Sequence, residues 1–164
     1  MIRRITPADC GAIAALEATL FATAFDQARL MTLQTNPVFC GFVDLVPDQD
    51  QPQLTSADDL ASYLGGYLLA MMIDGEAEIL SIGVTPDRQS RGVGKQLLQH
   101  FFDHGVSRNM ARVLLEVAED NVPALGLYRD FGFVEFARRK GYYKRGNQKI
   151  DAIMMKWCRA EAFP

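Results

Sequence analysis

The stretch RQSRGVGKQLL, residues Arg88–Leu98, places two glycines and three basic residues in a polar turn that leads directly into an apolar-striped segment. The apolar side chains of that segment recur at helical spacing: Val93, Leu97, Leu98, Phe101 and Phe102. This pattern predicts an amphipathic helix from Gly92 to about Arg108 that packs on a sheet. A glycine turn that opens a helix is typical of an anion site, because backbone N–H groups converge there and the positive end of the helix dipole faces the ligand. We expect a phosphate or a pyrophosphate.

Two other phosphate-binding motifs do not fit this turn. The sequence has no G-x-x-x-x-G-K-[ST], so the turn is not a P-loop. The glycines of G-V-G-K (92–95) lack the third glycine and the βαβ context of a dinucleotide fingerprint. A pair of glycines that only caps a helix remains the alternative to an anion site.

Hydrophobic patterning predicts the elements on both sides of the turn. Before it we expect a strand over 2–5, helices over 8–21 and 26–34, and strands over 38–46, 60–73 and 76–84, the last two joined by a tight hairpin at Asp74-Gly75. After it we expect a strand over 111–118, a helix over 121–131 closed by Gly132, and strands over 133–140 and 151–157 with GYYKRGNQ between them. The order βααβββαβαββ predicts a mixed α/β fold with an antiparallel meander, crossover helices and a closing hairpin. The polar segment Pro47–Asp59 is expected to be a solvated loop, with contact to a partner as the alternative.

Length and composition limit the class of protein. The chain has 164 residues, and we expect a single domain over residues 1–164. Its longest apolar run, Leu64–Ile73, is shorter than the about 20 residues of a membrane span. The arginines near the N-terminus precede no apolar segment of the kind found in secretory signals. We therefore expect a cytoplasmic protein that does not bind membranes.

Charge is unevenly distributed along the chain. Residues 1–87 hold three Lys/Arg against twelve Asp/Glu, and residues 88–164 hold fourteen against eight. The second half is therefore expected to meet an anionic ligand and the first half a cationic one, with two differently solvated faces as the alternative. An isoelectric point near 5.4 argues against nucleic acid as the anion.

Neither the cysteines nor the histidines predict a metal site. The three cysteines, Cys10, Cys40 and Cys158, are widely spaced, form no C-x-x-C and are interpreted as core thiols. His100 and His104 are four residues apart, as in some zinc sites, but the sequence offers no H-E-x-x-H and no evident third ligand. We interpret both as surface or flanking histidines, and we expect no metal.

Several motifs in chain order resemble one enzyme family. The segment TPDRQSRGVGKQLL resembles the acetyl-coenzyme A loop of the GNAT acetyltransferases, [QR]-x-x-G-x-[GA], with Gln89, Gly92 and Gly94 at the defined positions. Downstream matches resemble the RimI branch, bacterial enzymes that acetylate a ribosomal protein N-terminus. They are L-E-V at Leu115–Val117, N-x-x-A-x-x-L-Y at Asn121–Tyr128, G-F at Gly132–Phe133, R-x-x-Y-Y at Arg139–Tyr143 and D-A-I-x-M at Asp151–Met155. The resemblance is strong from about Glu78 to Lys156 and weak before Gly75. It implies the GNAT fold, a twisted, mostly antiparallel mixed sheet of about six or seven strands flanked by about four helices.

The resemblance also implies how acetyl-coenzyme A would be bound. Backbone groups of a splayed strand end, Ile82, Gly83 and Val84, would bind the pantetheine arm, and a bulge there would favour Gly83. The pyrophosphate would be held mainly by the backbone of seven consecutive residues: Gln89, Ser90, Arg91, Gly92, Val93, Gly94 and Lys95. Arg91 and Lys95 would add charge. Asn121 is a candidate helix N-cap, and in the family it also contacts the cofactor.

Two residues are the catalytic candidates. Glu116 lies in an otherwise apolar strand, LLEVA, where an unpaired carboxylate would be costly, so its presence requires a local reason. By resemblance it is the general base, acting through water on the acceptor amine. An ion pair with an arginine, or a position off the sheet edge, is the alternative. By resemblance Tyr128 is the general acid that protonates the departing sulfur, with plain core packing as the alternative.

The acceptor side is less defined by the sequence. By resemblance Arg139, Tyr142 and Tyr143 belong to a segment that covers the peptide substrate, and cross-strand packing is the alternative. The family's Phe-Pro-Trp-Ser stretch is replaced by ATAFDQ, residues 22–27. The expected acceptor is a protein or peptide N-terminal amine, with a ribosomal protein as the candidate. Lysine side chains or small amines are the first alternative, and a non-catalytic module that binds acetyl-coenzyme A is the second. The sequence does not indicate an oligomeric state.

Overall fold

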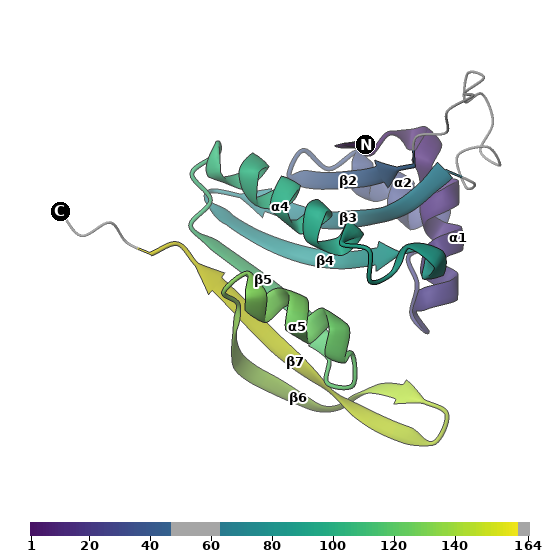
Figure 1. Cartoon of the computed structure of the whole chain (residues 1–164), viewed down its shortest axis with the longest axis vertical. Helices are drawn as coiled ribbons and strands as arrows, with labels where there is room; N and C mark the ends of the chain where they lie inside the picture. Colours follow the sequence, from purple (N-terminus) through teal and green to yellow (C-terminus); the bar gives the residue numbers. More distant parts are fainter. Residues whose placement is uncertain (47–62, 161–164) are drawn as a thin grey trace.

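The computed structural model describes residues 1–46 and 63–160 (Figure 1). In chain order the elements are β1 (Ile2–Arg4), η1 (Pro7–Asp9), α1 (Cys10–Leu20), α2 (Gln27–Gln34), β2 (Phe39–Leu45), β3 (Leu64–Ile73), β4 (Glu76–Val84), η2 (Pro86–Arg88), α4 (Val93–Val106), β5 (Arg112–Ala118), α5 (Val122–Asp130), β6 (Val134–Arg145) and β7 (Gln148–Cys158). The strands form one seven-stranded sheet in the order β1-β2-β3-β4-β5-β7-β6. The β4–β5 pair is parallel, and the other neighbouring pairs are antiparallel. The predicted fold class and element order are confirmed.

The closing hairpin is longer than the sequence predicts. The sequence predicts that the strands cover 133–140 and 151–157 with GYYKRGNQ between them, but β6 continues through Tyr143 to Arg145, and β7 begins at Gln148. This prediction is wrong because the segment has no apolar alternation, and its strand character depends on a bulge. Arg139 pairs with Ala152 and Tyr143 pairs with Ile150, so the residues between Arg139 and Tyr143 bulge out without ending the strand.

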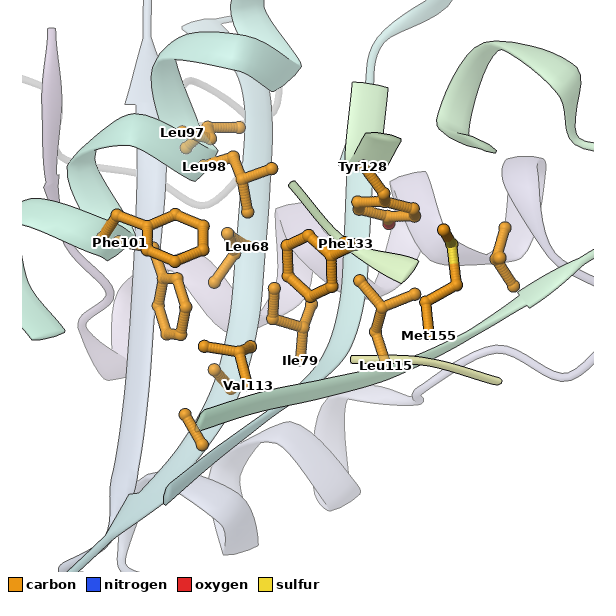
Figure 2. Close-up of a cluster of buried hydrophobic side chains, with 14 of the residues drawn as sticks. Leu68, Ile79, Leu97, Leu98, Phe101, Val113, Leu115, Tyr128, Phe133 and Met155 are labelled. Atoms are coloured by element: carbon orange, nitrogen blue, oxygen red, sulfur yellow. The ribbon is translucent and has the colours of Figure 1, made fainter. Parts of the chain in front are cut away.

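Helices cover both faces of the sheet, and each face has its own core. Figure 1 shows α4 and α5 in front of the sheet and the fainter α2 behind it. Beneath α4 and α5 the buried side chains of the first cluster include Leu68, Ile79, Leu97, Leu98, Phe101, Val113, Leu115, Tyr128, Phe133 and Met155 (Figure 2). Beneath α1 and α2 a second cluster contains Cys10, Ala12, Ile13, Leu16, Leu30, Val43, Leu64, Tyr67 and Leu69. A strand side chain in the first cluster therefore lies on the face covered by α4 and α5, and one in the second cluster lies on the face covered by α1 and α2.

The structure does not describe every predicted element. The polar segment expected over Pro47–Asp59, and the first residues of the strand expected over 60–73, lie outside the described residues. Within residues 1–46 and 63–160, no helix has both the length and the apolar character needed to cross a membrane.

Candidate active site

The glycine turn lies between η2 and α4, directly after the end of β4. Gly92 is the N-cap of α4 and has a φ of +84°, in the left-handed region that favours glycine. It has no side chain to cap the helix, so the first N–H groups of α4 stay available at the positive end of the helix dipole. A Cβ placed on Gly92 would meet no atom within 4 Å in the part of the chain that the structure describes. The space in front of the turn is therefore open.

The other residues of the turn have separate structural roles. The side chain of Gln89 donates from Nε2 to the carbonyl of Val84 at 3.2 Å, which ties the turn to the end of β4. Ser90 has a φ of +60°, a conformation that few side-chain-bearing residues adopt. A Cβ on Gly94 would lie 3.4 Å from Leu127 of α5, so this glycine allows α4 and α5 to approach each other. Two exposed basic side chains, Arg91 and Lys95, extend from the same turn.

Strands β4 and β5 separate beside this turn. Their parallel pairing runs from Glu76↔Arg112 to Ile79↔Leu115. Beyond it β4 stays with β3 and β5 continues along β7, and Figure 1 shows the two strands diverging. Within the described residues, 82–84 have no ladder partner on β5. Because unpaired buried backbone groups are costly, this edge suits a ligand that supplies hydrogen bonds.

The strand irregularity lies at Leu80 rather than at Gly83. Leu69 pairs with Ser81 and Ala70 pairs with Ile79, which leaves Leu80 without an opposite residue. The expectation that a bulge explains Gly83 is therefore wrong. Gly83 has a different reason, because a Cβ there would lie 2.4–2.5 Å from ring atoms and the hydroxyl of Tyr67 on β3.

Glu116 is the first residue of β5 beyond the last β4–β5 pair. Its neighbours Leu115 and Val117 are buried in the first cluster, so alternation places Glu116 on the opposite face, toward α1. Its side chain is 25% exposed. One carboxylate oxygen accepts a hydrogen bond from the Tyr143 hydroxyl at 3.3 Å, and the other lies 3.3 Å from Nη1 of Arg139. The ion pair with an arginine that was considered as an alternative is therefore present. It does not exclude that Glu116 also acts as a general base.

Tyr128 belongs to α5 and is 7% exposed. Its ring lies beside Phe133, with 5.7 Å between the ring centroids (Figure 2). Burial raises the pKa of Tyr128, and the nearby Tyr143 raises it further, so the phenol keeps its proton throughout the neutral range. Burial and the charge of Glu116 likewise raise the pKa of Tyr143 to about 12. Tyr143 thus contacts Glu116 and also lies within electrostatic reach of Tyr128.

Asn121 is the N-cap of α5. Its side-chain oxygen accepts a hydrogen bond from the amide of Ala124 at 3.3 Å, so the capping interpretation is confirmed. Asn121 lies between the end of β5 and the start of α5. Contact with a ligand stays a prediction.

Asp151 shapes the bulge that carries the acceptor-side residues. Its carboxylate accepts a hydrogen bond from the amide of Gly141 at 2.8 Å, and Gly141 has a φ of +60°. In this bulge Tyr142 is 52% exposed, and the guanidinium of Arg139 lies 5.0 Å from the centroid of its ring. Sequence reasoning noted Asp151 within a motif but not this role.

Residues 21–26 connect α1 to α2, at the place where the resemblance leads us to expect the acceptor groove. Asp26 is the N-cap of α2 and accepts a hydrogen bond from the amide of Arg29 at 2.7 Å. Phe25 packs against the second cluster, and the guanidinium of Arg29 lies 4.3 Å from its ring centroid. The replaced stretch therefore still begins a helix and contributes an aromatic side chain.

The two histidines of α4 face the sheet. The rings of His100 and His104 meet Phe42 edge to face, with centroids 4.7 and 5.3 Å apart. Burial and the adjacent Arg108 and Arg4 lower the pKa of His104 to about 4. These contacts agree with flanking histidines. Of the cysteines, Cys10 and Cys40 are buried as expected, but Cys158 is exposed at the end of β7, so the prediction of a core thiol is wrong there.

Comparison with known protein families decides the assignment. Residues 14–133 match the acetyltransferase (GNAT) family. The chain belongs to this family. It is thus a GNAT acetyltransferase, and the turn at Gln89–Lys95, the strand end at Ile82–Val84, and Glu116 all fall within the matched region.

Three relatives of this GNAT chain are named as acetyltransferases. It is 35% identical over 103 residues to the [ribosomal protein bS18]-alanine N-acetyltransferase of Salmonella typhimurium, covering 63% of this chain and 67% of that protein. It is 38% identical over 101 residues to the N-alpha-acetyltransferase RimI of Mycobacterium tuberculosis, covering 62% and 61%. It is also 39% identical over 88 residues to the mycothiol acetyltransferase of Clavibacter michiganensis, covering 54% of this chain and 29% of that protein.

Solved structures show the same GNAT fold. The crystal structure of the ribosomal-protein-S18-alanine N-acetyltransferase from Escherichia coli superposes with a TM-score of 0.81 at 24% identity, covering 100% of this chain and 98% of that chain. Arabidopsis thaliana NAA60 in complex with acetyl-CoA superposes with a TM-score of 0.78 at 18% identity, covering 97% and 98%. At these identities the likeness shows the fold alone.

A buried polar cluster around α1 was not predicted from the sequence. Glu17 of α1 is 1% exposed and accepts hydrogen bonds from the hydroxyls of Tyr67 and Ser81 and from the amide of Phe25. Burial, and then the charge of Glu17, raise the pKa of Tyr67. A carboxylate inside the apolar run of a predicted helix was the available signal, since such a group requires local partners.

Proposed function

We propose that this GNAT enzyme transfers the acetyl group of acetyl-coenzyme A to the α-amine of a protein N-terminus, with a ribosomal protein as the candidate acceptor. The observation that carries the proposal is the position of Glu116 on β5, one residue beyond the point where β4 and β5 separate. A carboxylate there is next to the strand edge that suits the thioester arm. The names of the bS18-alanine and N-alpha-acetyltransferase relatives support the choice of acceptor.

The two ends of acetyl-coenzyme A would meet two different features. The pyrophosphate would accept hydrogen bonds from the backbone of Gln89–Lys95 at the start of α4, with added charge from Arg91 and Lys95. The pantetheine arm would pair with the free edge of Ile82–Val84, in place of the absent β5 partner. Asn121 would meet the arm from the start of α5. The open space at Gly92 and the unpaired strand edge both fit such a ligand.

The reaction needs a free amine, a polarised thioester and a proton for the leaving sulfur. Glu116 would remove a proton from the acceptor ammonium, directly or through water. The amine nitrogen would then attack the thioester carbon, and backbone N–H groups of Ile82–Val84 would stabilise the oxyanion. As the carbon–sulfur bond breaks, the Tyr128 hydroxyl would give its proton to the sulfur, the nitrogen would lose its second proton to water, and a proton from water would restore the phenol. The raised pKa of Tyr128 keeps the phenol protonated at neutral pH, so that it still has a proton to donate.

The acceptor would approach from the α1 side of the sheet. Glu116 faces that side, and the bulge with Arg139, Tyr142 and Tyr143 borders it. Residues 21–26 would form the other border. An ammonium group suits this place because Glu116 can replace its ion pair with Arg139 by one with the acceptor.

A small-amine acceptor is the second candidate function. The specific observation in its favour is the 39% identity to a mycothiol acetyltransferase over 88 residues, which is as high as the identity to the N-terminal acetyltransferases. The replacement of the family's Phe-Pro-Trp-Ser stretch by ATAFDQ, residues 22–27, also favours a different acceptor. A non-catalytic binding module is the third reading, and the presence of both Glu116 and Tyr128 argues against it.

Mass spectrometry of acetylation tests these readings together. The panel contains peptides with ribosomal-protein N-termini, the same peptides with blocked α-amines and free lysines, and small amines including polyamines. Acetylation confined to free α-amines is the expected result. Transfer only to lysines or small amines would reject the N-terminal acceptor, and tight binding of acetyl-coenzyme A with no transfer to any amine would reject catalysis.

A further inference from the structure

Glu17 is a buried carboxylate without an ion-pair partner among the residues that the structure describes. Taking a carboxylate out of water costs several kcal/mol unless hydrogen bonds or a cation compensate it. Here the compensation comes only from neutral donors: the hydroxyls of Tyr67 and Ser81, and the amide of Phe25 at 3.1 Å. An apolar residue in place of Glu17 would leave these three donors without their acceptor. The carboxylate therefore joins α1, β3, β4 and the segment that contains Phe25 into one hydrogen-bonded unit.

The partners of Glu17 border the two sides of the proposed reaction site. Ser81 lies two residues before Gly83 on β4, and the end of the Tyr67 ring lies directly over Gly83, within 2.4–2.5 Å of the place of a Cβ. Phe25 belongs to residues 21–26, between α1 and α2. One carboxylate oxygen of Glu17 thus accepts hydrogen bonds from side chains of β3 and β4, and the other accepts one from the segment between α1 and α2.

Both carboxylate oxygens of Glu17 accept hydrogen bonds. The Oε1 atom of Glu17 accepts from both hydroxyls, and Oε2 accepts from the Phe25 amide. A carboxylate has enough lone pairs for all of these donors, whereas a carboxamide has one accepting oxygen and one donating nitrogen. A glutamine at this position can meet both sides only with its oxygen toward the Phe25 amide and its nitrogen toward the two hydroxyl oxygens, and the hydroxyls then lose the charged acceptor for their own protons.

We propose that Glu17, with Tyr67 and Ser81, is a positioning unit that fixes residues 21–26 at a set distance from the Gly83 end of β4, and so aligns the acceptor amine with the thioester. This inference rests on the proposed function, in which Ile82–Val84 binds the thioester arm and residues 21–26 border the acceptor. The unit touches neither reacting group. It acts through the backbone of Phe25 and through the ring over Gly83.

The test compares three variants with the wild-type chain. Glu17→Gln keeps the shape of the side chain but replaces its charge-assisted hydrogen bonds by weaker neutral ones, and Tyr67→Phe removes one donor while the ring still covers Gly83. Glu78→Gln is the matched control, because it neutralises an exposed carboxylate on the same strand, β4. We expect Glu17→Gln to raise KM for the acceptor peptide about 10-fold or more, since small misplacements of a substrate have effects of this size. Tyr67→Phe should do so more weakly, and Glu78→Gln not at all.

Two further readouts separate positioning from general destabilisation. Calorimetric affinity for acetyl-coenzyme A should change less than about 2-fold in all variants, because their effect is on the acceptor side. Hydrogen exchange at the Phe25 amide should accelerate in Glu17→Gln but not in Glu78→Gln, whether or not an acceptor is supplied. If Glu17→Gln does not fold, Tyr67→Phe decides the matter by the same measurements.

The outcomes distinguish this inference from the proposed function. Wild-type kinetics and wild-type exchange in Glu17→Gln would reject the positioning unit and leave the proposed function intact. A matching loss of acetyl-coenzyme A affinity and acceptor affinity would also reject it, in favour of a merely structural role. If the wild-type chain acetylates no amine in the panel, the proposed function fails. Faster exchange at the Phe25 amide in Glu17→Gln would then show that Glu17 holds residues 21–26 in place, although these residues border no acceptor site.

Discussion

Arg139 and Glu116 form an ion pair at the proposed acceptor site, with 3.3 Å between Nη1 and Oε2. The other oxygen of Glu116 is taken by the hydroxyl of Tyr143. An acceptor ammonium must therefore replace one of the two partners before Glu116 can serve as its base. The side chain of Arg139 is 50% exposed, whereas Tyr143 is partly buried, so Arg139 is the partner expected to leave.

Replacing Arg139 by glutamine should make the acceptor bind better. Without the guanidinium, the ammonium meets no competitor at Glu116, and KM for a peptide with a free α-amine should fall by up to about 5-fold, because exposed ion pairs contribute no more than about 1 kcal/mol. The kcat should stay within about 2-fold. Steady-state kinetics at low and high salt would check this, since the difference should shrink as salt screens the charges. A rise in KM would instead mean that Arg139 contacts the peptide directly.

Glu116→Gln should remove the general base. We expect kcat to fall about 100-fold or more near neutral pH, which is the usual size of a general-base effect. Affinity for acetyl-coenzyme A should not change, because the strand edge and the glycine turn are untouched. Stopped-flow or discontinuous assays together with calorimetry measure both quantities, and Glu78→Gln is again the control for a lost carboxylate on the sheet. Normal turnover would show that Glu116 is only the partner of Arg139.

Sequence periodicity predicted the helices and most strands of this fold because their side chains contact a core over many residues. The helix expected from Gly92 to Arg108 is observed as Val93–Val106, since its apolar stripe lies against the sheet. The end of β6 was missed for the opposite reason. Its course past the bulge depends on a hydrogen bond from Gly141 to Asp151, ten residues away, and no local pattern encodes that contact.

The candidate site divides in the same way. The glycine turn and Glu116 could be identified from the sequence, because a pair of glycines that opens an amphipathic helix and a carboxylate in an apolar strand are unusual by themselves. The cluster around Glu17 could not be predicted, since its partners Tyr67 and Ser81 lie 50 and 64 residues away. Only the register of β3 on β4 places these hydroxyls beside α1.

Tyr128→Phe should slow the chemical step while the fold stays intact. The ring packs beside Phe133 in the first cluster, and phenylalanine keeps that packing. The missing hydroxyl removes the proposed proton donor, so the single-turnover rate should fall about 100-fold. Rapid quench with acetyl-coenzyme A and a reactive peptide measures this rate, and thermal unfolding should show a midpoint close to that of the wild-type chain. An unchanged single-turnover rate would make Tyr128 a packing residue.

Gly92→Val should weaken binding of acetyl-coenzyme A. A φ of +84° costs a β-branched residue about 1 to 3 kcal/mol, so the turn would relax away from the geometry that presents the N–H groups of α4. Calorimetry should show at least a 10-fold rise in Kd. Gly146→Val is the matched control, because Gly146 has a φ of +59° with open space around it in the β6–β7 turn. If both variants bind equally well, the phosphate site is not at this turn.

Asp9→Asn should destabilise the start of α1, the helix that carries Glu17. Asp9 is 2% exposed, and its carboxylate accepts hydrogen bonds from the guanidinium of Arg3 at 2.8 Å and from the amide of Thr6 at 2.7 Å. Burial acts to raise the pKa of Asp9, but the hydrogen bonds from Arg3 and Thr6 outweigh it, and the pKa is lowered. The variant should lose about 1 to 3 kcal/mol of unfolding free energy at pH 7, the usual range for a buried charge-assisted network.

The dependence of this loss on pH follows from the direction of the shift. A carboxylate whose pKa is lower in the folded chain stabilises it above the unfolded pKa of about 4, and this stabilisation disappears as pH falls through the folded value. The difference between the wild-type chain and Asp9→Asn should therefore be constant from pH 7 to pH 5 and shrink below about pH 4. Urea unfolding at pH 7, 5 and 3 measures it, with the exposed Asp130→Asn as the control. An equal difference at pH 3 and pH 7 would mean that Asp9 acts through shape and hydrogen bonds, and that its charge contributes nothing to the stability of α1.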